Sequence, residues 1–384
     1  CTLRICVFVF AFAFVLFFIT HFNQGVLQME FGVAVGTIAA VDYAQHGERL
    51  GFTRCWVPDT PLIRSNVFAT MAAVALATKT IKIGSGVLVC GMRLAPEAAS
   101  GIATVNALAP GRTFAVIGAG NTGMRMMGLK PTGARAMREY VRVIKALLRG
   151  EEVMYASGGP GSEPQPVRFT GLEQEHVRLD PVPEVHVAGN GPLSHAVAGD
   201  TGDGLLVSIP RGGTFAEALS NTKRGAEKAG RTLPNNFHTA ALVNLLMLEP
   251  GESLTSDRVI NAVGPSVMAN FHYLADWVRE TGKAPPAYIQ PVWDDYMAFV
   301  KRQQGADAHL ALHETHYLTL QPDEARFLTP QILRNFCIIG EPPELIEQLR
   351  QLEREGLKQV TFFPPFKERY QVMERFAKQV MDKM

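Results

Sequence analysis

The sequence predicts an α/β protein built as a (β/α)₈ TIM barrel, with a long helical insertion between its seventh and eighth strands. Strand-like apolar segments and helix-like amphipathic segments alternate along nearly the whole chain. The 384 residues, of which 47% are hydrophobic and 19% charged, suffice for one large barrel and its core. Glycine-rich turns follow several strands, at the end where parallel sheets place their ligands.

The alternation begins after Met29 and gives eight strands, each followed by a helix. The strands are expected at 31–35, 53–57, 81–89, 112–117, 184–188, 204–208, 237–248 and 359–363. The helices are expected at 39–50, 66–78, 96–108, 132–149, 193–200, 214–229, 343–355 and 367–382. Prolines and glycines break the rhythm at 150–183. Residues 255–334 read as mostly helical and are too long for one crossover, so we expect them to form the insertion.

The first 28 residues differ from the rest of the chain. Fifteen uncharged apolar residues run from Ile5 to Ile19 behind Arg4. A membrane-spanning helix normally needs about 20 such residues, and no small-residue cleavage site follows the run. We therefore expect residues 1–28 to be translated upstream sequence outside the functional protein, with a membrane anchor and an export signal as the alternatives. Residues 29–384 are expected to form a single barrel domain.

Charge and cysteine content exclude several classes of protein. The formal net charge is +1 and no basic block is present, so the chain carries no electrostatic footprint for nucleic acid. The five cysteines form no CxxC and no metal-ligand spacing, which is typical of reduced buried thiols in a cytoplasmic protein. His313 and His316 are three apart, whereas the zinc motif needs a spacing of four. No metal site is expected, and a role for these histidines at the barrel mouth stays open.

One glycine-rich turn, residues 118–123, follows the fourth strand and matches the pattern G-x-G-x-x-G. In a dinucleotide-binding Rossmann fold this pattern follows the first strand of an open sheet. Eight strand–helix units fit a closed barrel better. A loop that touches an aromatic cofactor is therefore favoured over an NAD(P) site of the Rossmann type, and a purely structural turn is the remaining alternative.

A second turn, Gly189-Asn190-Gly191-Pro192, closes a strand and opens a helix. Proline suits the first helical turn, and the unsatisfied N–H groups there attract phosphate. The pattern is equally compatible with a phosphate site and with a plain strand-to-helix turn. Ser208, at the end of the next strand, is placed to add a hydroxyl donor to the same anion.

Asp59 follows Pro58 at the end of the second strand. A carboxylate on this face of a barrel is a candidate acid, base or substrate-orienting group. The alternative role is a cap for the helix that follows.

Taken together, these segments resemble the bacterial luciferase-like oxidoreductases. The similarity is closest to the branch of methylenetetrahydromethanopterin reductase and its flavin-dependent relatives. It is carried, in order, by residues 55–59, 80–87, 110–121, 188–192, 198–204 and 340–345, and it spans 31–250 and 328–365.

The resemblance implies a barrel that binds FMN or the deazaflavin coenzyme F420. The bound cofactor would then serve hydride transfer or monooxygenation of a small organic substrate, the deazaflavin pointing to hydride transfer and FMN to monooxygenation. In the deazaflavin branch a non-proline cis peptide ends strand three, which by position is Gly86–Val87. The phosphate would bind Gly189, Asn190, Gly191 and Pro192, and Gly120 and Asn121 would flank the rings.

Two departures from the family pattern bear on catalysis. Many relatives have a carboxylate where this chain has Ala34, and a histidine where it has Thr60. We expect Asp59 to orient the substrate or carry a proton, with His313 and His316 as partners, in a pocket formed largely by the 255–334 insertion. A non-catalytic flavin-binding protein on the same barrel is the alternative.

The expected partners follow from the same reading. They are a small-molecule substrate, a second copy of the chain in a homodimer and, for a monooxygenase, a separate flavin reductase. The expected location is the cytoplasm, and a membrane enters only if residues 5–19 are an anchor.

Overall fold

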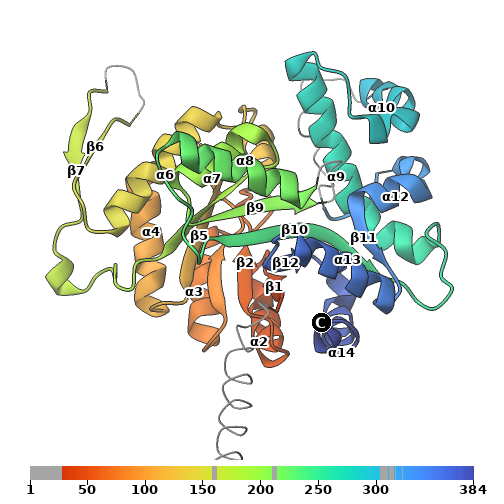
Figure 1. The fold of residues 1–384 in the computed structure, drawn as a ribbon, viewed down its shortest axis with the longest axis horizontal. Helices are drawn as coiled ribbons and strands as arrows, with labels where there is room; N and C mark the ends of the chain where they lie inside the picture. Colours follow the sequence, from red (N-terminus) through yellow and green to blue (C-terminus); the bar gives the residue numbers. More distant parts are fainter. Residues whose placement is uncertain are drawn as a thin grey trace, which may run out of the picture.

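The computed structural model describes residues 28–157, 162–209, 214–302, 310, 315, 317–321 and 323–384. Eight parallel strands close into a barrel, because β10 pairs with both β9 and β12 and β12 pairs with β1 (Figure 1). In barrel order they are β1 (Glu30–Ala34), β2 (Arg54–Val57), β3 (Lys82–Ser85), β5 (Thr113–Gly118), β8 (Glu184–Ala188), β9 (Gly204–Ile209), β10 (His238–Met247) and β12 (Gln359–Phe362). The predicted TIM barrel is confirmed.

Helices form the outer layer, because each parallel strand needs a crossover to reach the next. They are η1 (Ile38–Ala40), α2 (Val41–Arg49), α3 (Val67–Ala77), α4 (Ala95–Leu108), α5 (Asn121–Met126), α6 (Ala134–Leu148), α7 (Pro192–Thr201), α8 (Phe215–Lys228), α13 (Pro342–Arg354), η5 (Phe366–Glu368), α14 (Arg369–Gln379) and η6 (Met381–Lys383). The apolar stripe of α6, including Met137, Val141, Ile144 and Leu148, is buried against the barrel as its period predicts.

Five short elements depart from the expected pattern: α5, β4 (Leu88–Val89), β6 (Val153–Tyr155), β7 (Gln165–Val167) and η2 (Leu172–Gln174). The segment after Gly120 is helical at once as α5, whereas the sequence reading began the helix near Thr132. The strand expected at 81–89 is divided into β3 and β4. The excursion at 150–183 contains the hairpin of β6 and β7, followed by η2. Pieces of two to six residues are too short for a hydrophobic period to show.

One parallel strand outside the barrel ring, β11 (Cys337–Gly340), was not predicted. The first half of β10 pairs with β9 and β12 inside the barrel, and its second half runs on to pair with β11. The length of β10, ten residues, is what makes room for this extra strand.

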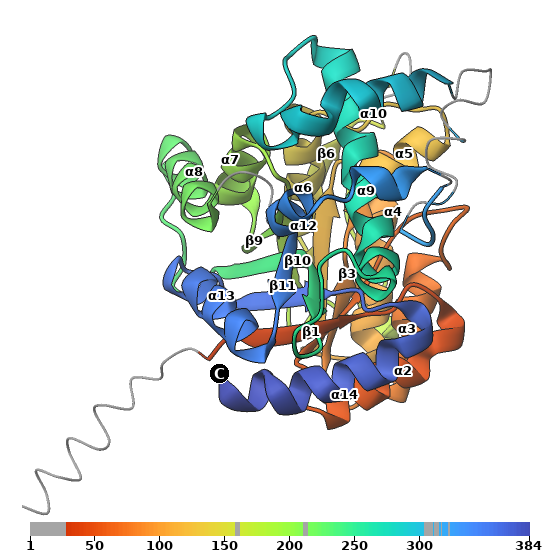
Figure 2. The same ribbon diagram turned by 90° about the vertical axis from the view of Figure 1, so that its right-hand side faces the viewer.

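The insertion between the seventh and eighth barrel strands is confirmed. It comprises α9 (Asp257–Thr281), η3 (Ala287–Ile289), α10 (Gln290–Arg302), η4 (Glu324–Phe327) and α12 (Pro330–Phe336). These helices pack on one another through an apolar cluster of their own, apart from the core between the barrel and its outer helices. It includes Phe271, Tyr296, Phe327 and Phe336. Figure 2 shows α9 and α10 at the end of the barrel where α5 lies. The insertion therefore covers the carboxyl ends of the strands.

The amino-terminal end of the barrel interior is polar. His238 contacts Arg54 and Gln359 through its two ring nitrogens, and its ring lies 5.3 Å from that of His186. Burial, together with the positive charge of Arg54, lowers the pKa of His238 to about 2. Burial also lowers the pKa of His186, so both histidines are held neutral inside the barrel.

The apolar run at 5–19 lies outside the described residues. Within the described part of the chain, the helices are all too short or too polar to cross a bilayer. Cys55, Cys90 and Cys337 are buried free thiols, in agreement with the reduced state expected from their scatter.

Candidate active site

A cavity of about 1260 Å³ opens at the carboxyl ends of the barrel strands. It exceeds the roughly 300–1,000 Å³ typical of small-molecule pockets, so a cofactor and a substrate can share it. Each described residue that the sequence singled out for the site lines this one cavity: Asp59, Gly86, Val87, Gly120, Asn121, Gly189, Asn190, Gly191, Pro192 and Ser208. The exceptions, His313 and His316, lie outside the described residues.

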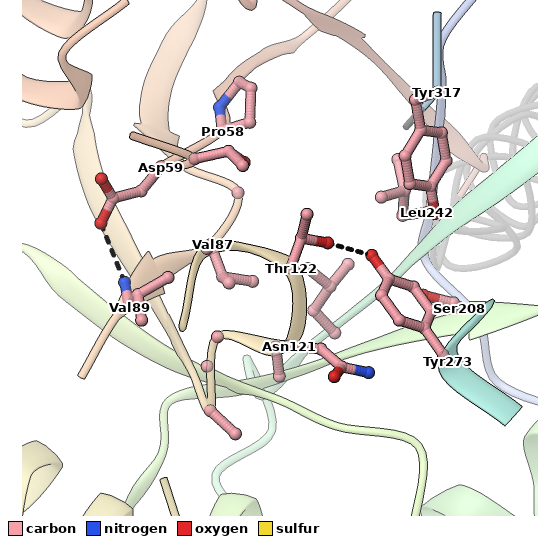
Figure 3. A pocket seen from close by; sticks show the side chains of 18 of the residues that line it. Pro58, Asp59, Val87, Val89, Asn121, Thr122, Ser208, Leu242, Tyr273 and Tyr317 are labelled. Carbon is pink, nitrogen blue, oxygen red and sulfur yellow. Dashed lines mark hydrogen bonds between the residues drawn. The ribbon is translucent and has the colours of Figure 1, made fainter. Parts of the chain in front are cut away.

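One wall of the cavity is the segment that joins β3 to β4. The Gly86–Val87 peptide is cis, as the resemblance implied. Residue 86 packs so closely on Trp56 that an added Cβ would lie 2.9 Å from Cε3 of the indole ring. The side chain of Val87 lines the cavity (Figure 3) and lies over Gly118, where an added Cβ would come within 2.7 Å of it.

The glycines of the 118–123 turn are required by packing. Gly120 has φ +78°, and a Cβ there would lie 2.1 Å from a methyl group of Val89. A Cβ on Gly123 would lie 2.2 Å from the methyl group of Met92. These glycines let the end of β5 approach the β3–β4 segment. The turn follows the fourth strand of a closed barrel, so the Rossmann alternative does not hold.

Asp59 lies at the edge of the cavity with its carboxylate already engaged. Its Oδ2 accepts hydrogen bonds from the N–H of Val89 at 3.0 Å and from Nη1 of Arg93 at 2.5 Å. Its Oδ1 accepts a bond from Nη2 of Arg93 at 3.2 Å. Figure 3 shows the carboxylate directed toward Val89 and away from Tyr273 and Tyr317. This geometry ties β4 to the end of β2, and a role for Asp59 in carrying a proton stays a prediction.

Asn121 and Thr122 are held by contacts with the insertion. Oδ1 of Asn121 accepts a hydrogen bond from Nε of Arg125 at 2.6 Å. Arg125 in turn pairs with Asp276 and Glu280 of α9, at 3.1 and 2.6 Å. These ion pairs fix the Asn121 amide at the cavity wall and dock α9 on α5.

Thr122 and Tyr273 join across the cavity through their hydroxyl groups (Figure 3). Tyr273 comes from α9, so the insertion contributes a protic group to the pocket. Most of the described lining, however, comes from the barrel strands and the loops after them, so the expectation that the insertion largely forms the pocket is wrong. The sequence reading missed this tyrosine. Its only signal was a polar aromatic residue within a segment expected to line the pocket.

The 189–192 turn faces the cavity from β8. An added Cβ on Gly191 would meet no atom within 4 Å, so the glycine leaves an open cradle there. Leu193 and Ser194 follow in the first turn of α7 and also line the cavity, and N–H groups of a first helical turn have no intrahelical acceptor. Oδ1 of Asn190 accepts a hydrogen bond from the N–H of Ser208 at 2.7 Å, which joins the ends of β8 and β9.

The charged groups that line the cavity are mostly cationic. Four cations, Arg64, Arg125, Lys283 and Arg369, face two carboxylates, Asp59 and Glu280. Both carboxylates are bonded to arginines, Arg93 and Arg125 respectively. The described lining therefore carries a net positive charge, which favours an anionic ligand.

A closed barrel with a glycine-lined, electropositive cavity at its carboxyl end defines a TIM-barrel enzyme that binds a phosphorylated cofactor. The sequence model of the luciferase-like monooxygenase family matches residues 13–359, and the chain belongs to this family. The prediction of a luciferase-like oxidoreductase that uses a flavin or a deazaflavin is thereby confirmed.

Individual relatives and one solved structure are similar to the chain over most of its length. It is 26% identical over 332 residues to 5,10-methylenetetrahydromethanopterin reductase of Archaeoglobus fulgidus, covering 84% of this chain and 88% of that one. It is 22% identical over 365 residues to F420-dependent glucose-6-phosphate dehydrogenase of Amycolatopsis mediterranei, covering 90% and 93%. Its fold is similar to coenzyme F420-dependent tetrahydromethanopterin reductase from Methanopyrus kandleri, with a TM-score of 0.63, 19% identity and coverage of 93% and 99%.

Proposed function

We propose that the protein is a coenzyme F420-dependent oxidoreductase that moves a hydride between the deazaflavin and a small organic substrate. One observation carries the proposal. The segment that joins β3 to β4, with Val87, the amide of Asn121 and the 189–192 turn all line one cavity. The two sequence relatives support the deazaflavin over FMN, because one is F420-dependent by name and the other is a reductase of the branch that the motifs resemble.

The cavity fits a phosphorylated deazaflavin on the chain's own features. The open cradle at Gly191 and the first-turn amides of Leu193 and Ser194 suit a phosphate. Val87 and Asn121 would hold the two sides of a flat ring system, which supplies the hydride-accepting carbon when it is bound. The large number of glycines on this wall gives the ring close access to backbone.

The chain's own groups would then orient the substrate and handle its proton. The hydroxyl pair of Tyr273 and Thr122 is the protic group we assign to the substrate oxygen or nitrogen, in place of the groups that relatives carry at the positions of Ala34 and Thr60. A proton held at Oη of Tyr273 can pass to or from a substrate hydroxyl within hydrogen-bond reach. The insertion would exclude bulk water from this step.

Binding of the two cofactors tests the proposal. The full chain is titrated separately with F420 and with FMN, by the fluorescence of each, and then with F420 in the Gly191→Leu variant. We expect tight binding of F420, weak binding of FMN and at least tenfold weaker F420 binding in the variant. Tight binding of FMN alone would contradict the proposal, and would point to a monooxygenase that needs a separate flavin reductase.

The remaining expectations are tested by three further measurements. Light scattering of the purified protein checks the proposed homodimer, and a monomer at micromolar concentration would oppose it. Reduction of bound F420 by a panel of alcohols, aldehydes and pterins separates an enzyme from a flavin-holding protein without turnover. We expect the cytoplasm as the location, which fractionation of the native cells would check.

A further inference from the structure

We propose that Arg64 binds an anionic group of the substrate, a carboxylate or a phosphate, on the side of the cavity opposite the 189–192 turn. The inference rests on the proposed function, because it assigns the 189–192 turn to the cofactor phosphate. It adds a substrate class to that function: a small organic anion that carries the group to be oxidised or reduced.

Arg64 is held in a fixed place between two strand-end loops. Its N–H donates to the carbonyl of Thr60 at 2.9 Å, within the loop that follows β2. The next residue, Ser65, bonds to the loop after β1: its N–H donates to the Gly36 carbonyl, and its Oγ accepts from the N–H of Ile38 at 3.1 Å. The Arg64 side chain then lies against Gly36, where an added Cβ would be 3.2 Å from Nη1.

The guanidinium of Arg64 has no counter-charge among the residues that the structure describes. It lines the cavity, and it makes no ion pair or side-chain hydrogen bond with any residue of the described ranges. Two other arginines near the cavity differ, because Arg93 is paired with Asp59 and Arg125 with Asp276 and Glu280. Partial burial lowers the pKa of Arg64, a sign that its cationic form is poorly solvated.

A partly desolvated guanidinium is stabilised when a ligand brings an anion to it. Its planar fork can donate two parallel hydrogen bonds to one carboxylate or phosphate, a geometry that lysine cannot provide. Arg369, which follows β12 beside β1 and also lines the cavity, adds positive charge on the same side. Its guanidinium lies over the ring of Tyr370, 4.9 Å from the centroid.

The barrel order separates this group from the cofactor-phosphate turn. Arg64 belongs to the loop after β2, which packs on the loop after β1. The 189–192 turn follows β8, which is four places from β1 in the eight-stranded ring. Strands four places apart face each other across a barrel, so one phosphate cannot occupy both positions. The second anion therefore belongs to the substrate.

The test uses F420-loaded full-length protein and two simple anions, inorganic phosphate and succinate, titrated by isothermal calorimetry. We expect at least one of them to bind the wild type at one site per chain. In Arg64→Met its affinity should fall at least about tenfold, since a hydrogen bond to a charged group contributes roughly 1.5–3 kcal/mol. Arg64→Lys should retain part of the affinity, and Arg135→Met, at an exposed position on α6, should retain all of it.

Three results would overturn the inference. These are equal anion affinity in wild type and Arg64→Met, absence of binding of either anion to the wild type, and loss of F420 affinity in Arg64→Met. The last result would place Arg64 on the cofactor instead. Failure of the wild type to bind F420 at all would instead count against the proposed function. The same anion titrations on the cofactor-free protein would then still report on Arg64.

Discussion

Replacing Asp59 by asparagine separates a positioning role from proton transfer. The side chain is nearly isosteric, but the variant loses the charge that Arg93 faces and weakens the acceptor for the N–H of Val89. Because β4 and the adjoining Val87 wall are tied to β2 through this carboxylate, we expect the cofactor wall to loosen. F420 affinity should fall in Asp59→Asn, and kcat at saturating F420 should keep its pH profile.

The expected loss of unfolding free energy in Asp59→Asn follows from the burial of the ion pair between Asp59 and Arg93. Asp59 is 6% exposed, and removing one partner of a buried pair costs about 3–5 kcal/mol. The Arg93 side chain is 15% exposed and keeps Glu97 at 3.5 Å as a second partner, so we expect a loss of stability just below that range, about 2–3 kcal/mol. The matched control is Glu97→Gln, because Glu97 is 58% exposed and its pair should contribute less than about 1 kcal/mol.

The assay combines urea unfolding with F420 titration of the wild type, Asp59→Asn, Arg93→Met and the double variant. If the pair acts as a unit, the double variant should be less destabilised than the sum of the single variants. The reasoning would be refuted by a variant with wild-type stability and F420 affinity but much lower kcat, since that pattern marks a catalytic carboxylate.

Three further predictions concern the cavity and the core. Gly120→Ala should weaken F420 binding by at least about tenfold, because it adds a clash to the 1–2 kcal/mol cost of positive φ. The control is Gly128→Ala, because Gly128 is also at positive φ but has open space around it, and this variant should lose stability without losing F420 affinity. Equal F420 affinity in the two variants would contradict the prediction for Gly120. Tyr273→Phe should lower kcat at least about tenfold by deleting the hydroxyl bonded to Thr122, with F420 affinity within about twofold; unchanged kcat would remove the tyrosine from the mechanism. His238 has a folded pKa of about 2 against an ordinary 6.5, so its contribution to stability is complete above pH 6.5 and is lost as pH falls. Between pH 8 and pH 5 the wild type should lose about 2 kcal/mol more unfolding free energy than His238→Gln, and parallel losses would contradict it.

The fold could be predicted because its signal is local and repeated. A barrel strand such as β5 is a buried apolar run, and a covering helix such as α6 has an apolar stripe. The elements that were missed are short or depend on distant partners. The four residues of β11 become a strand only because β10 extends past the barrel, and nothing within those residues shows it.

The residues of the candidate site also fall into those that a local signal predicts and those that depend on distant partners. Gly120, Gly189 and Gly191 were found because glycine at the end of a strand has a local physical meaning. Asp59 was found as a carboxylate at a strand end, but its partner Arg93 lies 34 residues on, and the sequence does not show the pairing. Tyr273 meets Thr122 across 151 residues of chain. Arg64 is distinctive because it has no ion-pair partner among the described residues, which only the assembled cavity reveals.

A crystal structure of the full chain with F420 tests the central claim most directly. The account predicts the phosphate on the amides of Leu193 and Ser194 beside Gly191, and the ring system between Val87 and Asn121. A phosphate bound instead at Arg64, or a ring outside this cavity, would contradict it.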